Sequence, residues 1–307
     1  MRTVRFGLIV IAGLLAGSGC AWISPDNVPA EVPLAEQTSL PTAPLPTVST
    51  NSDLAAKVPS DVAASGVLTF VTEPQYAPMA FTVGDNLTIV GADVELGTAV
   101  AKTLGLEGQW SATTFDRLLP SVEDGDFDAS MSALTITSER LEDVNMVSYL
   151  RAGLAWAVAK GNPEDLSIED ACGHTVAVQR STVQADDVEQ RSADCTAAGK
   201  PAITIVFFAV ASAATEALLA GEVDALVADG PVMASAVAGN SDVIEQLGEP
   251  YDEGLLGIAV SASDDALADV VQQAVQALIN DGTYGEILDR WGLADNAITT
   301  AELNPVQ

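Results

Sequence analysis

A short polar stretch in the middle of the chain has the residue types of a carboxylate-binding loop. It follows an apolar run and reads Ser132-Ala133-Leu134-Thr135-Ile136-Thr137-Ser138-Glu139-Arg140. The hydroxyl of Thr135 and the backbone N–H groups of the loop can donate hydrogen bonds, and the Arg140 guanidinium can grip both oxygens of one carboxylate. Ser132, Ala133, Thr135 and Arg140 are therefore candidate ligand-binding residues. On this stretch alone, a solvated loop with a surface arginine is the alternative.

An internal repeat indicates which elements position this stretch. One copy reads Gly125-Asp126-Phe127-Asp128-Ala129, and the other reads Gly221-Glu222-Val223-Asp224-Ala225. Each follows an apolar helical segment and precedes a buried strand and a polar loop. Ligands of open α/β sheets lie at the carboxyl ends of the strands. We therefore expect one unit in each of two lobes, with Arg140 and Asp229 facing a shared cleft, which suits a zwitterionic ligand.

Short motifs between Gly66 and Leu293 resemble, in order, those of the family 3 substrate-binding proteins of ATP-binding-cassette (ABC) importers, which bind polar amino acids. The motifs are Gly66-Val67-Leu68, Tyr76-Ala77-Pro78, Gly91-Ala92-Asp93-Val94-Glu95-Leu96, Phe115-Asp116, the first repeat, Thr135-Ile136-Thr137-Ser138-Glu139-Arg140, Val178-Gln179-Arg180-Ser181-Thr182, Val223-Asp224-Ala225, Gly257-Ile258-Ala259-Val260, Asp281-Gly282-Thr283-Tyr284 and Trp291. The resemblance implies an α/β fold of the two-lobed type II periplasmic-binding-protein kind. Each lobe would be a mixed, mostly parallel sheet flanked by helices, and two hinge crossings would join the lobes.

The resemblance also implies ligand contacts from the first lobe. In the family, an acid at the place of Glu73 often faces the side chain of the ligand, and a solvated loop acid is the alternative for this residue. The ring of Tyr76 can cover a ligand, although a core tyrosine is the alternative. Phe115 stands where the family has the second aromatic residue that sandwiches the ligand.

In the second lobe, Ser181 and Thr182 open the helix that follows a predicted strand at 176–178. Free N–H groups at the start of a helix, together with the Thr182 hydroxyl, can take a carboxylate. Arg180 stands where the family usually has glycine, and its side chain either adds a positive contact or points to solvent.

The N-terminus has the pattern of an export signal. Arg2 and Arg5 precede an apolar segment, and Gly17-Ser18-Gly19-Cys20 resembles a lipobox, which predicts lipidation of Cys20 and an anchor on the outer face of the cell membrane. Gly17 stands where the lipobox prefers leucine, so ordinary secretion is the alternative.

The chain has three cysteines. In an oxidising compartment Cys172 and Cys195 would pair, which leaves Cys20 for the lipid, whereas two free thiols are the alternative.

The chain divides into five predicted segments, the second of which is rich in proline and lacks apolar periodicity. They are a signal peptide at 1–19, a disordered tether at 20–60, lobe one at 61–151, lobe two at 152–248, and the rest of lobe one at 249–307 with a loosely held tail after Leu293.

Composition excludes several classes of function. The formal net charge of −31 argues against nucleic acid and against an anionic membrane surface as partners. Asp124, Asp126 and Asp128 mimic the start of a calcium loop, but Ala129 and Thr135 stand where that loop needs glycine and glutamate, so we expect no metal. We also expect no catalytic residues and no cofactor.

We expect a monomeric, lipid-anchored, extracytoplasmic solute-binding protein. It would capture a polar or basic amino acid and deliver it to an ABC permease. One alternative is binding of an ectoine-like compatible solute, and another is a dehydratase on the same scaffold. A dehydratase is the weaker alternative because the sequence offers no evident nucleophile–base pair.

Overall fold

The computed structural model describes residues 40–84 and 88–306. The predicted signal peptide, Cys20 and the first part of the predicted tether lie outside the described residues. In these two ranges, no helix combines the length and the apolar character that a bilayer crossing requires.

The strands, in chain order, are β1 (Val67–Thr72), β2 (Gln75–Tyr76), β3 (Ala80–Val83), β4 (Thr88–Val90), β5 (Glu107–Ala112), β6 (Ala129–Thr135), β7 (Val144–Ala159), β8 (Thr175–Gln179), β9 (Thr204–Phe208), β10 (Ala225–Asp229) and β11 (Ile244–Ser261). The helices are α1 (Ser52–Ala55), α2 (Ser60–Ser65), α3 (Ala92–Thr103), α4 (Leu118–Glu123), α5 (Arg140–Asp143), α6 (Val183–Ala197), α7 (Ala211–Leu219), α8 (Gly230–Gly239), α9 (Asp265–Asp281) and α10 (Thr283–Trp291), with 3-10 turns η2 (Phe115–Arg117) and η3 (Ala294–Asn296).

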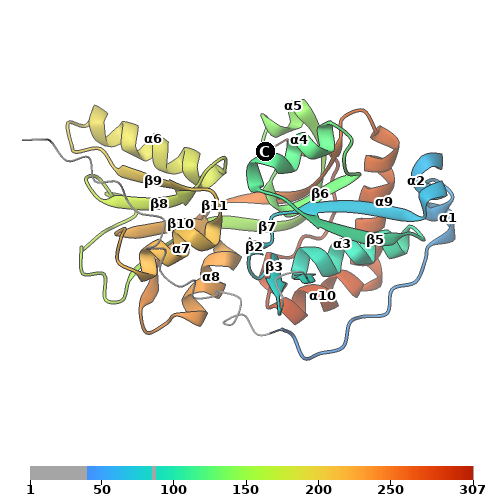
Figure 1. Cartoon of the computed structure of the whole chain (residues 1–307), viewed down its shortest axis with the longest axis horizontal. Helices are drawn as coiled ribbons and strands as arrows, with labels where there is room; N and C mark the ends of the chain where they lie inside the picture. Colours follow the sequence, from blue (N-terminus) through green and yellow to red (C-terminus); the bar gives the residue numbers. More distant parts are fainter. Residues whose placement is uncertain (1–39, 85–87, 307) are drawn as a thin grey trace, which may run out of the picture. The chain divides into compact units, whose positions relative to one another are not determined.

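The described residues form an α/β fold built on an eight-stranded sheet in the order β5-β1-β6-β11-β7-β10-β8-β9. In lobe one, β1 pairs in parallel with β5 and β6. In lobe two, β8 pairs in parallel with β9 and β10. Figure 1 shows α3, α9 and α10 grouped with the strands of lobe one, and α6, α7 and α8 grouped with those of lobe two. Strands β2, β3 and β4 make a small separate sheet.

Two long antiparallel strands, β7 and β11, run through both lobes and join the two expected sheets into one. Their pairing extends from Val144 opposite Ser261 to Ala159 opposite Ile244, with register shifts in β11 between 247 and 254. The strands approach closely there, because a Cβ atom at Gly153 would lie 2.8 Å from the Tyr251 carbonyl oxygen. Only glycine fits at residue 153 without a shift of the backbone.

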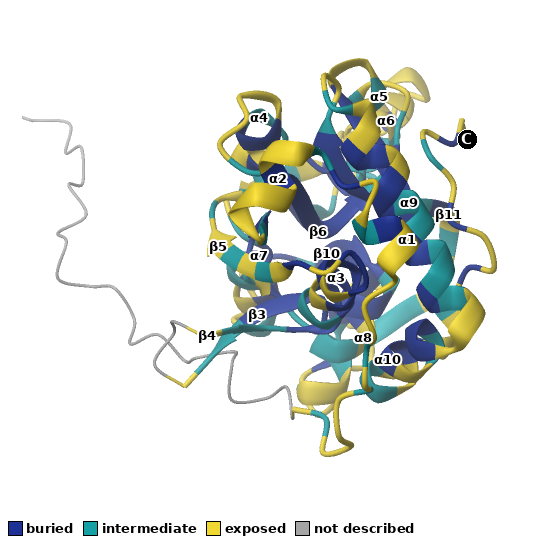
Figure 2. Ribbon diagram, turned by 90° about the vertical axis from the view of Figure 1, so that its right-hand side faces the viewer, coloured by how far each residue is buried: buried dark blue, intermediate teal, exposed yellow. Residues whose placement is uncertain are grey.

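The core lies between the sheet and the helices that cover it, and in Figure 2 the buried residues concentrate on the strands and on the inner faces of the helices. The longest helix, α9, buries Leu267, Val270, Val271, Val275 and Leu278. Burial of each such side chain contributes about 1.5–3 kcal/mol. The helix is therefore a main support of lobe one.

The internal repeat has the same role in both lobes. Asp128 Oδ2 accepts a hydrogen bond from the Thr69 backbone N–H at 2.7 Å, and Asp224 Oδ2 accepts one from the Thr175 backbone N–H at 2.7 Å. In each copy the aspartate just before a central strand binds the backbone of the neighbouring parallel strand. The repeated unit predicted from the sequence is thus present in the structure.

The predicted pairing of Cys172 with Cys195 is confirmed in the structure, with the two Cα atoms 5.6 Å apart. The bond joins the turn before β8 to the last part of α6. The chain-entropy model gives about 3.4 kcal/mol of stabilisation for a loop of this length.

The predicted disorder of the tether is wrong for its last residues. Asn51 caps α1, and its backbone N–H donates to the Thr103 carbonyl at 2.8 Å. Leu54 and Val58 are buried in the core of lobe one. These two apolar residues anchor a segment whose composition otherwise favours disorder.

The tail after Leu293 is also better held than the sequence predicts. Ile298 and Ala301 are buried, and the Ile298 backbone N–H donates to the Tyr284 hydroxyl at 2.9 Å. The Glu302 carbonyl accepts from the Ser148 backbone N–H. The tail therefore packs along β7 and α10 as part of lobe one.

Candidate functional site

The structure brings Arg140 together with three other predicted site residues. The guanidinium donates to the Thr135 carbonyl through Nη1 at 2.7 Å, and to the Ser181 carbonyl through Nη2 at 3.3 Å. Its Cζ lies 5.7 Å from the centre of the Phe115 ring. Burial lowers the pKa of Arg140, while the negative charges of Asp229, Asp186 and Glu139 raise it. The first contact fixes the side chain to its own loop, and the second reaches across to lobe two.

Asp229, at the end of β10, is buried where the lobes meet. Its carboxylate accepts hydrogen bonds from the Tyr76 hydroxyl at 2.6 Å and from Gln184 Nε2 at 2.8 Å. Burial raises the pKa of Asp229 to about 6, against the lowering effects of Tyr76, Arg140 and Gln184. Tyr76 thus reaches lobe two through its hydroxyl.

Glu73 follows the last residue of β1 and is only 1% exposed. Its backbone N–H donates to Ser132 Oγ at 3.1 Å. Neither of its carboxylate oxygens has a hydrogen-bond partner among the described residues. Burial raises the pKa of Glu73 to about 7, although the side chain of Gln179 and the backbone N–H of Gln75 lie close enough to lower it. A buried carboxylate without a partner is costly, which marks a place for a cationic group.

The start of α6 has a different arrangement from the one predicted. The Thr182 hydroxyl donates to the Gln179 carbonyl at 2.7 Å and accepts from the Ala185 N–H at 3.2 Å. The single hydroxyl proton is thus engaged within the helix cap. Ser181 adopts a left-handed conformation with φ 63°, and the side chain of Arg180 is exposed.

Three glutamines near the site were missed in the sequence. Gln184 binds Asp229, Gln179 lies near Glu73, and Gln75 Oε1 accepts a hydrogen bond from the Ser212 hydroxyl of α7 at 2.7 Å. Gln184 lies in the first turn of α6, two residues after the predicted Thr182 contact. Its place at the start of the helix could have marked Gln184 as a site residue.

A small pocket opens in lobe two beside Asp229. Its polar wall consists of Tyr76, Gln179, Thr182 and Gln184. The remaining wall is mostly apolar and comes from α7, β10 and α8. Asp229, Glu73, Phe115 and Arg140 do not line this pocket, so it adjoins the candidate site only at Tyr76 and Thr182.

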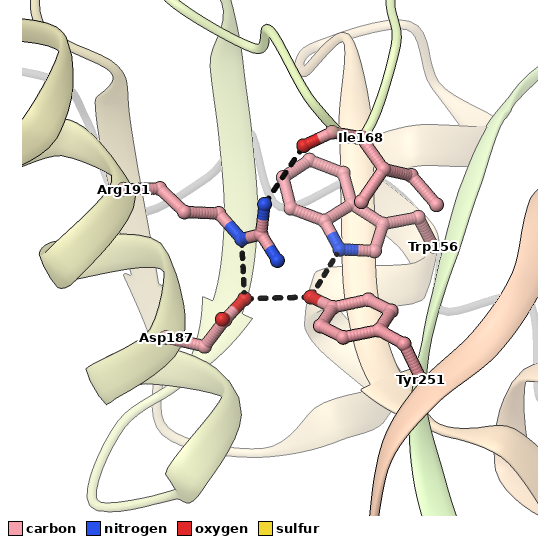
Figure 3. Close-up of polar contacts among 5 residues, drawn as sticks. All are labelled: Trp156, Ile168, Asp187, Arg191 and Tyr251. Carbon is pink, nitrogen blue, oxygen red and sulfur yellow. Dashed lines mark hydrogen bonds and ion pairs between the residues drawn. The ribbon is translucent and has the colours of Figure 1, made fainter.

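A polar cluster ties α6 to both crossing strands (Figure 3). Arg191 pairs with Asp187 at 2.8 Å and donates to the Ile168 carbonyl at 2.8 Å. Asp187 also accepts from the Tyr251 hydroxyl at 2.6 Å, and that hydroxyl accepts from the Trp156 indole N–H at 2.8 Å. The helix whose first turn contributes to the site is therefore held to β7 and β11.

The site combines one guanidinium, two buried carboxylates and aromatic side chains. In the part of the chain that the structure describes, no three Asp, Glu, His or Cys residues are grouped to hold a metal ion. The guanidinium and the two carboxylates match the charges of a small zwitterion with a further cationic group.

Comparisons with known proteins agree with this arrangement. The model of the bacterial extracellular solute-binding proteins, family 3, matches residues 68–294. The arginine-binding protein ArgT of Corynebacterium glutamicum is 38% identical over 253 residues, which cover 82% of this chain and 83% of that protein. The glutamine-binding protein GlnH of Bacillus subtilis is 28% identical over 214 residues, which cover 68% and 75% of the two chains.

Among solved structures, an ancestral arginine-binding protein bound to arginine is similar with a TM-score of 0.69 and 30% identity, covering 74% of this chain and 98% of the other. These structures are type II periplasmic binding proteins, as the sequence predicted for this chain. The curated relatives are solute-binding proteins and not enzymes, which does not support the dehydratase alternative. The chain belongs to the bacterial extracellular solute-binding proteins, family 3.

Proposed function

We propose that the protein captures an amino acid with a cationic side chain, arginine foremost, and delivers it to an ABC permease. The observation that carries this proposal is the buried Glu73 carboxylate, whose oxygens have no hydrogen-bond partner among the described residues. A guanidinium binds such a carboxylate through two parallel hydrogen bonds. The names of similar proteins support the proposal, because ArgT of Corynebacterium glutamicum binds arginine.

Each charged group of arginine then has a partner of opposite charge. The ligand carboxylate binds Arg140, the α-ammonium binds Asp229, and the guanidinium binds Glu73. Tyr76 and Phe115 flank the aliphatic part. A neutral side chain would leave the Glu73 carboxylate buried without a counter-charge, which disfavours such ligands.

A calorimetric titration at several pH values tests this proposal. We expect arginine to bind more tightly than ornithine, glutamine or ectoine at about pH 8. The Glu73 carboxyl, with its pKa raised to about 7, must be ionised to pair with the guanidinium. Between about pH 8 and pH 5, the affinity for arginine relative to glutamine should therefore fall roughly a hundredfold. Protonation of Asp229 weakens the binding of both ligands, so its effect cancels in the ratio of the two affinities.

Two results would contradict the proposal. One is tighter binding of glutamine or ectoine than of arginine at about pH 8. The other is an arginine-to-glutamine ratio that does not change with pH, because a partner of Glu73 without positive charge would not require the carboxyl to be ionised.

We further propose that the mature protein is a monomer held outside the cell membrane by a lipid on Cys20. The signal-like N-terminus and the lipobox-like residues before Cys20 support this. Cys20→Ala is expected to move the protein from the membrane fraction to the medium, as measured by fractionation and immunoblotting. Arg180→Ser, at an exposed residue, is the control and should leave the protein in membranes. A membrane-bound Cys20→Ala variant would contradict the lipid anchor.

A further inference from the structure

One residue of lobe one has an unusual backbone conformation within a buried strand. Ala133, near the end of β6, has φ 47°. For a residue with a Cβ atom the left-handed conformation is unfavourable. The pairing of β6 with β11 is irregular close to this point, with a register shift between Gly257 and Ala259. Ala133 therefore lies in the irregular part of β6, two residues before Thr135 and the loop that leads to Arg140.

A buried carboxylate holds Ala133 in this conformation. Asp93 Oδ2 accepts the Ala133 backbone N–H at 2.9 Å, and Asp93 Oδ1 accepts the Tyr149 hydroxyl at 2.8 Å. Asp93 is fully buried. Hydrogen bonds to an ionised acceptor are roughly twice as strong as neutral ones. The contact is thus well suited to offset the unfavourable backbone angle.

The position of Asp93 is itself fixed from the other side. It lies in the first turn of α3, where the helix dipole favours a negative charge. A Cβ atom at Gly91, just before the helix, would lie 2.1 Å from the Met79 carbonyl oxygen. The start of α3 therefore packs directly on the backbone of Met79, and Asp93 cannot easily move away from β6.

We propose that Asp93 is a positioning residue for ligand binding, acting by holding Ala133 in the left-handed conformation that aims the Thr135–Arg140 loop into the site. Asp93 is 0% exposed and contacts the loop through the Ala133 backbone N–H, so its proposed role is to position the loop and not to bind the ligand. This inference rests on the proposed function, since the ligand is taken to bind at Arg140.

Arginine and glutamine titrations of four variants test the link. In Asp93→Ala the N–H of Ala133 loses its acceptor, and we expect affinity for both ligands to fall roughly tenfold or more. Asp93→Asn keeps an acceptor for that N–H, because its amide can donate to Tyr149 instead, and it should stay within about threefold of the wild type. Ala133→Gly alone measures the effect of the glycine, and the double variant is compared with it.

The double variant Asp93→Ala, Ala133→Gly is the decisive one. Glycine adopts the left-handed conformation without the steric penalty, so most of the lost affinity should return. The melting temperature should stay low, because the Tyr149 hydroxyl still lacks its partner. Recovery of affinity without recovery of stability separates positioning from general support of the core.

Asp128→Ala is the matched control. Its carboxylate also accepts two hydrogen bonds, from the Thr69 backbone N–H and hydroxyl at 2.7 Å each, but at the opposite end of β6. This variant should lose stability and keep its affinity.

Should Asp93→Ala fail to fold, Ala133→Val tests the same link, because a β-branched residue resists a positive φ and should weaken binding roughly tenfold.

Three outcomes would overturn the inference. They are an unchanged affinity in Asp93→Ala, a loss that Ala133→Gly does not recover, and an unchanged affinity in Ala133→Val. If the wild type binds neither arginine nor glutamine, the proposed function fails first. If it binds one of them and these variants behave in any of the three ways, only the positioning role fails.

Discussion

Arg140→Ala is expected to weaken arginine binding by roughly 30- to 4,000-fold. The guanidinium is held in place by the carbonyls of Thr135 and Ser181, so it is preorganised to receive a carboxylate. Removal of one member of a buried charge pair costs about 2–5 kcal/mol in binding, and each 1.4 kcal/mol is about tenfold in affinity. Calorimetry with arginine measures the loss directly.

Two further variants sharpen this test. Asp229→Ala should cause a loss of similar size, because it removes the partner of the α-ammonium. Arg117→Ala is the control, since Arg117 is exposed on lobe one and has the same side chain as Arg140. Near-normal affinity in Arg140→Ala would mean that the ligand has no carboxylate in this loop.

Glu73→Gln is expected to reverse the ligand preference. The amide has the shape of the carboxylate but carries no charge, so arginine should lose roughly a hundredfold or more in affinity. Glutamine should bind as well as before or better, because its binding no longer leaves a charge unpaired. Parallel titrations with both amino acids give the change in preference.

Although Glu73→Gln weakens arginine binding, it should stabilise the ligand-free protein. The pKa of Glu73 is raised from 4.5 to about 7 on folding. The contribution of Glu73 to the free energy of unfolding is therefore greatest below about pH 4.5. It falls by up to about 3 kcal/mol as the pH rises through 7. Glu73→Gln removes this dependence and should raise the melting temperature above pH 7. A variant that melts lower at high pH would contradict the burial of a free charge.

The features predicted most accurately depend on short stretches of sequence. Strand β8, at Thr175–Gln179, contains the predicted strand at 176–178, because a short apolar run defines it locally. The repeat was recognised from five residues in each copy, and Asp128 and Asp224 make the same contact because each binds a strand that neighbours its own in the sheet. Short patterns of this kind therefore predict the local structure correctly.

The features that were missed depend on contacts between distant segments. Asp93 reads as an ordinary charged residue in the first turn of a helix, and only the approach of β6 makes it a buried acceptor. Ala133 carries no sign of its left-handed conformation, since alanine is common in every kind of structure. The segments around Leu54 and Ile298 have too few apolar residues to form a pattern, and their burial depends on packing against distant parts of lobe one.

The pairing of Ala159 with Ile244 has a consequence for how such chains can be recombined. The segment 160–243 leaves β7 and re-enters β11 at two adjacent points of the sheet within lobe two, so its ends already meet. A segment with adjacent ends can be exchanged for its counterpart from a relative while the host fold is kept. Such a graft would carry Asp229 and leave Glu73 and Arg140 with the host. The host would then select the ligand's side chain through Glu73, and the grafted segment would bind its ammonium through Asp229.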